Sequence, residues 1–126
     1  PNSFPLRYQL AQTCLLVAEA SKKLTKAATL GTKKEEYKQA EQNNLQRAKS
    51  ELEQAYKLDA LNAFYYYTES MIMEYEGIDC KNFPRVEKYI SLLLTAFALD
   101  PQNKEIEKKL QSTVEFITNR WESLAN

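Results

Sequence analysis

The segment Ala98–Asn103, ALDPQN, stands between two strongly helical stretches and decides how the chain is organised. Forty-one residues earlier, Lys57–Asn62 reads KLDALN, with the same Leu-Asp pair and the same Asn three residues after the Asp. In the later copy Pro101 follows the Asp, and the residue before a proline avoids helical dihedral angles. We therefore predict that each copy ends one helix and begins the next through a tight corner.

The composition favours helices over strands. Only two glycines and four prolines occur among the 126 residues, whereas Ala, Leu, Glu, Lys and Gln are frequent. A chain of this length can bury a core as one domain, so we expect a single all-α domain over residues 1–126. Because the chain begins at Pro1 without a Met, we expect it to be excised from a longer protein.

Apolar periodicity and stop signals predict five antiparallel helices. The first spans residues 5–30 and stops at Gly31, and the second runs from the Thr32–Glu35 capping box to Leu58. The other three are expected at residues 63–76, 84–99 and 103–124. The expected buried stripe of the first helix contains Leu6, Leu10, Ala11, Cys14, Leu15, Val17, Ala18, Leu24 and Ala28. That of the fifth contains Ile106, Leu110, Val114, Ile117 and Trp121.

The two corners belong to a longer repeat. The pattern A-x3-L-x2-A ends at Ala55 before the first corner, and Y-x3-L-x2-A ends at Ala96 before the second. After the first corner, residues 66–77 place bulky, small and bulky side chains and then a Gly. Over about residues 48–110 the chain resembles the tetratricopeptide repeat family, whose pattern is W-x2-L-G-x2-Y, then A-x3-F, then P.

The resemblance is degenerate. Glu69 stands where the family prefers Leu, and Tyr89 where it prefers Ala. The spacing of 41 residues exceeds the usual ~34 of the family, with the excess in residues 77–84, GIDCKNFP. What the resemblance implies is a short right-handed solenoid of stacked helical hairpins, with helix 63–76 between its neighbours and Ala55 and Ala96 at close approaches.

The resemblance also implies a protein-interaction module that binds through the first helix of each hairpin. In the segment 63–77, AFYYYTESMIMEYEG, aromatic and Met side chains occupy two sides of the expected helix. We place Tyr66 in the core and predict a concave partner-binding groove on the other side. That groove contains Phe64, Tyr67, Met71, Glu74 and Tyr75. The expected ligand is a short amphipathic or apolar segment of another protein, with a basic residue near Glu74; burial of both sides is an equal alternative.

Two other interpretations stay open. The chain could be a structural or self-assembly piece of a longer solenoid or scaffold, because such stacks usually need three repeats, and a homo-oligomer would cover its open end. A three-helix module of the microtubule-interacting-and-transport type, made of the first three helices, would instead leave the last two without a role.

Enzymatic chemistry is not expected. The chain contains no His, and its two glycines lie 46 residues apart, so the usual general base and a phosphate-binding loop are both missing. No cofactor and no metal are expected either. Cys14 and Cys80 are isolated thiols, which suits the cytoplasm or another reducing compartment.

The charge pattern excludes some partners and leaves one feature open. Seventeen basic residues balance seventeen acidic ones, so we expect no nucleic-acid binding, and no apolar segment is long enough for a membrane span. A lysine cluster lies around the first helix–helix turn, at Lys22, Lys23, Lys26, Lys33, Lys34 and Lys38. It either docks an acidic or phosphate-bearing partner or stabilises the negative end of the first helix.

Overall fold

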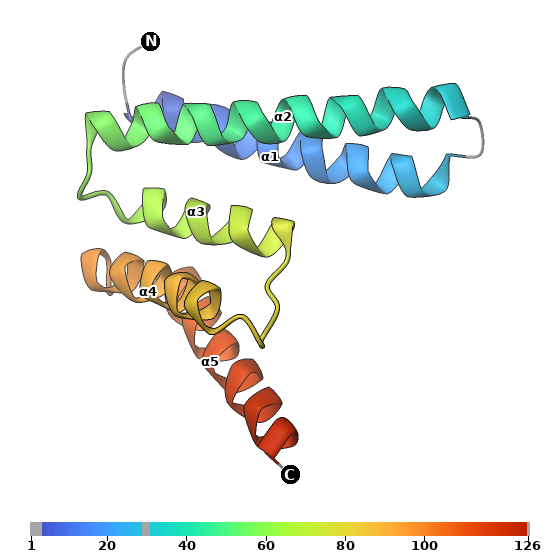
Figure 1. Ribbon diagram of the computed structural model, residues 1–126. Coiled ribbons are helices and arrows are strands. Elements are labelled where there is room, and N and C mark those ends of the chain that lie inside the picture. The colour runs from blue at the N-terminus through green and yellow to red at the C-terminus, as the bar shows by residue number, and fades with distance from the viewer. Residues whose placement is uncertain (1–3, 29–30, 126) are drawn as a thin grey trace. The chain divides into compact units, whose positions relative to one another are not determined.

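The computed structural model describes residues 4–28 and 31–125, and in that range it is built from helices without a strand (Figure 1). The expected all-α class is therefore confirmed. The helices are α1 (Phe4–Ala27), α2 (Gly31–Leu58), α3 (Ala63–Glu76), α4 (Phe83–Leu99) and α5 (Lys104–Ala125). The chain divides into two compact units, unit 1 (Pro1–Ala60) and unit 2 (Leu61–Asn126), which are described separately.

Unit 1 is a hairpin of two long helices, α1 and α2 (Figure 1). Its fully buried residues include small side chains on both helices, among them Ala11, Ala18 and Ala48, which let helices approach closely. A charged hydrogen bond ties the helices together, since Arg7 Nη1 lies 2.7 Å from Glu51 Oε2. The polar middle of α2 does not interrupt it, and there the Asn44 side chain donates to the Ala40 carbonyl.

Part of the stripe expected in the core of α1 is exposed. Cys14 and Leu15 are buried, but Val17 and Leu24 are 42% and 47% exposed. Because α1 carries apolar residues around most of its circumference, the sequence pattern did not single out the side that faces α2.

The boundary between α1 and α2 differs from the expected one. Gly31 is the first residue of α2, and within residues 4–28 and 31–125 a positive φ is confined to Gly77, at 98°. The prediction of a left-handed stop at Gly31 is therefore wrong. The expected end of the first helix at residue 30 and the side chain of Thr32 lie outside the described residues.

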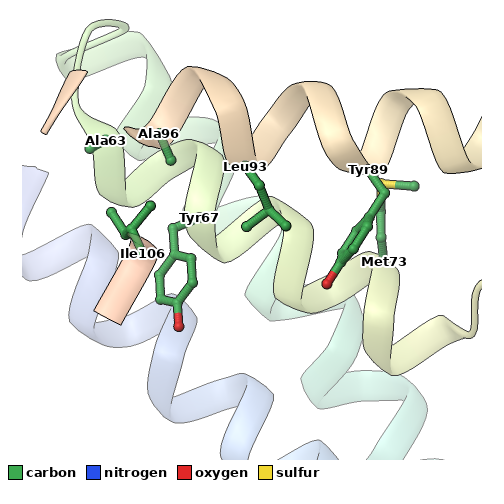
Figure 2. Close-up of a cluster of buried hydrophobic side chains, with 7 residues drawn as sticks. All are labelled: Ala63, Tyr67, Met73, Tyr89, Leu93, Ala96 and Ile106. Atoms are coloured by element: carbon green, nitrogen blue, oxygen red, sulfur yellow. The ribbon is translucent and has the colours of Figure 1, made fainter. Parts of the chain in front are cut away.

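Unit 2 packs α3, α4 and α5 around one apolar core, in which α4 contacts both of the others. The buried residues of this core are Ala63, Tyr67, Met73, Tyr89, Leu93, Ala96 and Ile106 (Figure 2). Ala96 is fully buried and belongs to the same core as Ala63, so its expected burial is confirmed (Figure 2). Since α3 belongs with α4 and α5, the chain is not grouped as a three-helix module of α1 to α3.

The two Leu-Asp-x-x-Asn corners end their helices in the same way. The Asp59 N–H donates to the Ala55 carbonyl at 3.0 Å, and the Asp100 N–H donates to the Ala96 carbonyl, also at 3.0 Å. Each corner therefore closes the last turn of the preceding helix with one additional backbone bond.

The corners also begin the next helices in the same way. Asn62 Oδ1 accepts from the Phe64 N–H at 3.0 Å. Asn103 Oδ1 accepts from the N–H groups of Glu105 and Ile106, at 3.0 and 3.2 Å. Both Asn side chains thus act as N-caps, which satisfy amides that a helix start leaves without a partner. The two corners are therefore equivalent as local helix ends and helix starts, whereas their equivalence as hairpin-to-hairpin junctions stays a prediction.

A third corner lies in residues 77–84, which were expected to be excess loop; it begins its helix in the same way, but the helix before it ends differently, at Gly77, whose N–H donates to the Met73 carbonyl. Asn82 Oδ1 accepts from the Arg85 N–H at 3.3 Å, and the Asn82 N–H donates to the Asp79 carbonyl at 2.9 Å. Asp-x-x-Asn therefore recurs at Asp59, Asp79 and Asp100, at intervals of 20 and 21 residues. The interval of 41 residues contains two helices, each with its own capped start.

Replacing Asn103 with Ala should lower the free energy of unfolding by about 1 kcal/mol, within a range of about 0.5–2, because two helix-start amides lose their acceptor. Asn103→Ser, which keeps a capping oxygen, is the control and should cost clearly less. Urea denaturation measures both. Equal midpoints for Asn103→Ala and the unchanged protein would contradict the assignment of Asn103 as an N-cap.

Candidate functional site

A cleft of about 370 Å³ in unit 2 is the candidate functional site, and residues of α3, α4, α5 and the α3–α4 corner line it. We call it the unit 2 cleft. Its lining residues are Glu74, Ile78, Cys80, Tyr89, Lys109, Ser112, Thr113, Phe116 and Ile117.

One wall of the cleft is a closed polar network. Glu74 Oε1 accepts from Lys109 Nζ at 2.7 Å, and Glu74 Oε2 accepts from the Tyr89 hydroxyl at 3.0 Å. Burial raises the pKa of Tyr89 to about 12, and the Glu74 carboxylate acts in the same direction against an opposing hydrogen bond with Thr113. Tyr89 is therefore a neutral donor at neutral pH, and the charges of Glu74 and Lys109 offset each other.

Apart from Ser112 and Thr113, the rest of the cleft presents mainly apolar surface. Ile117 is buried, and Ile78 is half-buried and packs against the core of unit 2. Phe116 is 64% exposed, although it lines the same cleft. An exposed aromatic ring beside buried aliphatic side chains provides a large contact area for another molecule.

The stripe expected to be buried on α5 is only partly buried. Ile106 and Ile117 lie in the interior, but Val114 is 44% exposed and Trp121 is 40% exposed. The prediction that these last two are core residues is wrong. α5 is longer than the core that α3 and α4 supply, so a single stripe along its whole length could not be covered.

Trp121 instead lies on the surface, where it contacts the third corner. Its indole Nε1–H donates to the Cys80 carbonyl at 3.2 Å, and its ring meets Phe83 edge-on with centroids 5.8 Å apart. A second apolar groove, of about 460 Å³, begins at this aromatic pair and continues along α4. Its lining residues are Phe83, Val86, Glu87, Ile90, Ser91, Leu94 and Trp121.

The residues predicted for the groove on α3 differ in their exposure, and one of them is buried in the core. Tyr67 belongs to the core of unit 2: it is 8% exposed, and its hydroxyl donates to Glu105 Oε1 at 3.0 Å. Met71 is half-buried against the same core, and Tyr75 is half-buried. Phe64 is 37% exposed. Of the five predicted residues, Glu74 lines the unit 2 cleft.

Tyr66 was expected in the core, and Tyr67 was expected in a groove on an adjacent side of α3. Tyr66 is half-buried and packs against the edge of the core, whereas Tyr67 is one of its buried members. Three consecutive tyrosines place a ring on every side of a helix, so periodicity alone did not identify the side covered by the other helices of unit 2.

Two apolar residues of α5 line the cleft, Phe116 and Ile117. Ile117 was expected in the core, and no role was predicted for Phe116. Phe116 precedes Ile117 in the polar context EFITN, and neighbouring residues on a helix point about 100° apart. One narrow buried stripe therefore cannot contain both Phe116 and Ile117. This adjacency is the signal that could have identified Phe116 as a surface residue.

No protein-family model, no curated protein and no solved structure matches the chain. Over the described part of the sequence, no group of three or more Cys, Asp or Glu side chains is arranged to hold a metal ion. In the same part, none of the helices has both the length and the apolar character needed to cross a membrane.

Proposed function

We propose that this chain is a non-catalytic protein–protein interaction module that binds an apolar segment of another protein in the unit 2 cleft. The observation that carries the proposal is the pairing of the charged groups in its wall. Glu74 and Lys109 are neutralised by each other, and Tyr89 donates to the same carboxylate. What the cleft offers a ligand is therefore the apolar surface of Ile78, Phe116 and Ile117.

The size and chemistry of the cleft define the ligand. At about 370 Å³ it stands near the lower end of the ~300–1,000 Å³ range of small-molecule pockets, which suits one or two large apolar side chains of a partner segment. A basic partner residue near Glu74 would have to displace Lys109, whose Nζ lies 2.7 Å from the carboxylate. Apolar anchoring, with Phe116 as the main contact, is thus the basis of recognition.

A tetratricopeptide-like stacking of the hairpins is part of this proposal. What supports it is the equivalent geometry of the corners at Asp59 and Asp100, where one helix stop and one Asn cap recur. Under this proposal, the module's binding surface involves α3 and α5, the helices that follow these two corners.

Phe116→Asp should weaken peptide binding by about tenfold or more, because it places a charge where an apolar anchor must be buried. Peptides would be selected from a random displayed library on the unchanged chain, and the affinity of each would be measured by fluorescence polarisation. Leu94→Asp is the matched control: it charges an exposed apolar residue, 51% exposed, on the α4 groove.

The proposal fails if no peptide is selected. It also fails if Leu94→Asp lowers the affinity for the selected peptides as much as Phe116→Asp does. Light scattering over a range of concentrations tests the self-assembly alternative. If the unchanged chain forms oligomers that Phe116→Asp dissociates, the cleft joins copies of this chain and the binding proposal is overturned.

A further inference from the structure

The exposed side of α1 carries a seven-residue repeat. Leu10, Val17 and Leu24 are seven residues apart, and the residues between them follow the alternating spacing of four and three that a coiled-coil seam requires. We call this set the α1 outer stripe. It comprises Leu6, Leu10, Thr13, Val17, Ala20, Leu24 and Ala27, all of them half-buried or exposed.

None of the residues of the α1 outer stripe is among the buried residues of α1. The buried residues of α1, among them Ala11, Leu15 and Ala18, lie on a different side of the helix. A repeat of 3.5 residues keeps its register only against another helix, and large residues alternating with small ones let two helices interdigitate. Leu10, Val17 and Leu24 supply the large positions of such a seam. Thr13, Ala20 and Ala27 supply small ones, and Leu6 is a large residue in the same register as these three.

The end of the stripe lies in a strongly basic part of the chain. Residues 20–40 contain six lysines and two glutamates, a net charge of +4, so the other residues together carry −4. One of these glutamates, Glu36, forms an exposed ion pair with Lys33 at 3.4 Å. Lys23 flanks the stripe directly, seven residues after the exposed Leu16.

The helix dipole explains only part of this charge. Lys26 lies in the last turn of α1, where a cation is favoured by the negative end of the helix. Lys33 and Lys34 lie in the first turn of α2, where the dipole is positive and a cation is disfavoured. All three lysines are exposed, so a partner can reach them.

We propose that the α1 outer stripe binds an amphipathic helix of another protein whose flanking positions are acidic. Its apolar residues would pack against Leu10, Val17 and Leu24, and its carboxylates would face Lys23 and the lysines of the α1–α2 turn. This site is separate from the unit 2 cleft and does not depend on the function proposed for it.

Two other occupants fit less well. A second copy of α1 aligned in parallel would bring two basic ends together, and an antiparallel copy would place that end opposite residues 4–19, whose Arg7 and Glu19 cancel. An anionic membrane would match the charge, but helices that lie in membrane interfaces present Trp, Phe and Leu. The outer stripe contains no aromatic residue, and three of its seven positions are Thr or Ala.

The test uses a fluorescent synthetic helix about four heptads long, with Leu at the a and d positions and Glu at every flanking e and g position. The comparison peptide has Lys in place of each Glu. Both peptides are kept monomeric by like-charge repulsion. We expect the full chain to bind the Glu peptide at least about tenfold more tightly than the Lys peptide, with a preference that weakens as salt is added.

Three variants assign the binding to this face. Val17→Asp should weaken the binding of the Glu peptide by about tenfold. Because Val17 is already 42% exposed, the variant should keep its fold, which circular dichroism would verify. Lys23→Glu combined with Lys34→Glu should reverse the preference between the two peptides. Leu94→Asp, the matched control in unit 2, should change neither affinity.

The proposal is overturned if the two peptides bind equally, if Leu94→Asp acts like Val17→Asp, or if neither peptide binds. It is also overturned if the chain binds vesicles of phosphatidylserine and phosphatidylcholine but not the Glu peptide, and if Val17→Asp abolishes the vesicle binding. That result would assign the stripe to a membrane surface. Concentration-dependent dimerisation that Val17→Asp removes, with no peptide binding, would assign the stripe to a second copy.

Discussion

Tyr67→Ala should lower the free energy of unfolding by about 3–5 kcal/mol, the cost of removing a buried aromatic ring from a packed core. The ring is 8% exposed and is surrounded by members of the unit 2 core on α4 and α5, including Leu93 and Ile106 (Figure 2). Its hydroxyl also donates to Glu105 Oε1, so truncation leaves both a cavity and a lost hydrogen bond. Urea denaturation followed by circular dichroism measures the change.

Two companion variants separate the contributions. Tyr67→Phe keeps the ring and should cost only about 0.5–1.5 kcal/mol, the net contribution of one hydrogen bond. Tyr66→Ala removes a half-buried ring at the edge of the same core and should cost less than Tyr67→Ala. If Tyr66→Ala were the more destabilising of the pair, the side of α3 that faces the core would be the one first expected from the sequence.

How far the sequence predicts the fold depends on whether a signal is local. The corners are local: an Asp that ends one helix and an Asn three residues later that caps the next are both readable from one short segment. The expected bounds of helix 63–76 therefore agree with α3, and the corners at Asp59 and Asp100 have the predicted roles. The corner at Asp79 was not predicted because Ile78 precedes it, so the full Leu-Asp-x-x-Asn motif is absent there.

Which side of a helix is buried is not a local property. α1 and α3 carry apolar residues on more than one side, so the side that becomes core depends on where the neighbouring helices lie. Val17, Leu24 and Trp121 were expected in the core and are exposed, whereas Tyr67 was expected in a groove and is buried. The differences at Val17, Leu24 and Tyr67 follow from choosing one apolar side of a helix that has two, whereas Trp121 is exposed because α5 is longer than the core that α3 and α4 supply.

The same uncertainty explains how much of the candidate site was predicted. Glu74 was expected at the rim of a binding groove, and it lies in the wall of the unit 2 cleft. The apolar contacts in that cleft come from α5 and from the α3–α4 corner, two segments outside the groove predicted on α3. A cleft made by several helices depends on their packing, and no single amphipathic pattern encodes it.

Exposed apolar surface on a helix with two apolar sides still requires an explanation. Singly exposed Leu or Val residues are ordinary in folded proteins, but an ordered seven-residue repeat is not explained by incomplete burial. In α1 that repeat is accompanied by lysines that the dipole of α2 disfavours. The two features support each other, because a helix partner accounts for the spacing and its acidity accounts for the charge.

Leu93→Ala should lower the free energy of unfolding by about 2–5 kcal/mol, whereas the same change at the next residue, Leu94→Ala, should alter it by no more than about 0.5 kcal/mol. Leu93 is fully buried and points from α4 into the core between Tyr67 and Tyr89, while Leu94 is 51% exposed on the α4 groove (Figure 2).

Because the two variants delete the same atoms from consecutive residues of one helix, any change in helix propensity is shared, and the difference between them measures burial alone. Leu93 is central to unit 2, so its truncation should leave a cavity that cannot collapse without moving α3 or α5, which places the expected cost in the upper part of the range. Urea denaturation of both variants, with an unchanged slope of unfolding against urea as the control for two-state behaviour, gives the comparison. Equal midpoints for Leu93→Ala and Leu94→Ala would mean that α4 turns a different side toward α3 and α5. The assignments of Tyr89 and Ala96, which share the buried side of α4 with Leu93, would then be wrong as well.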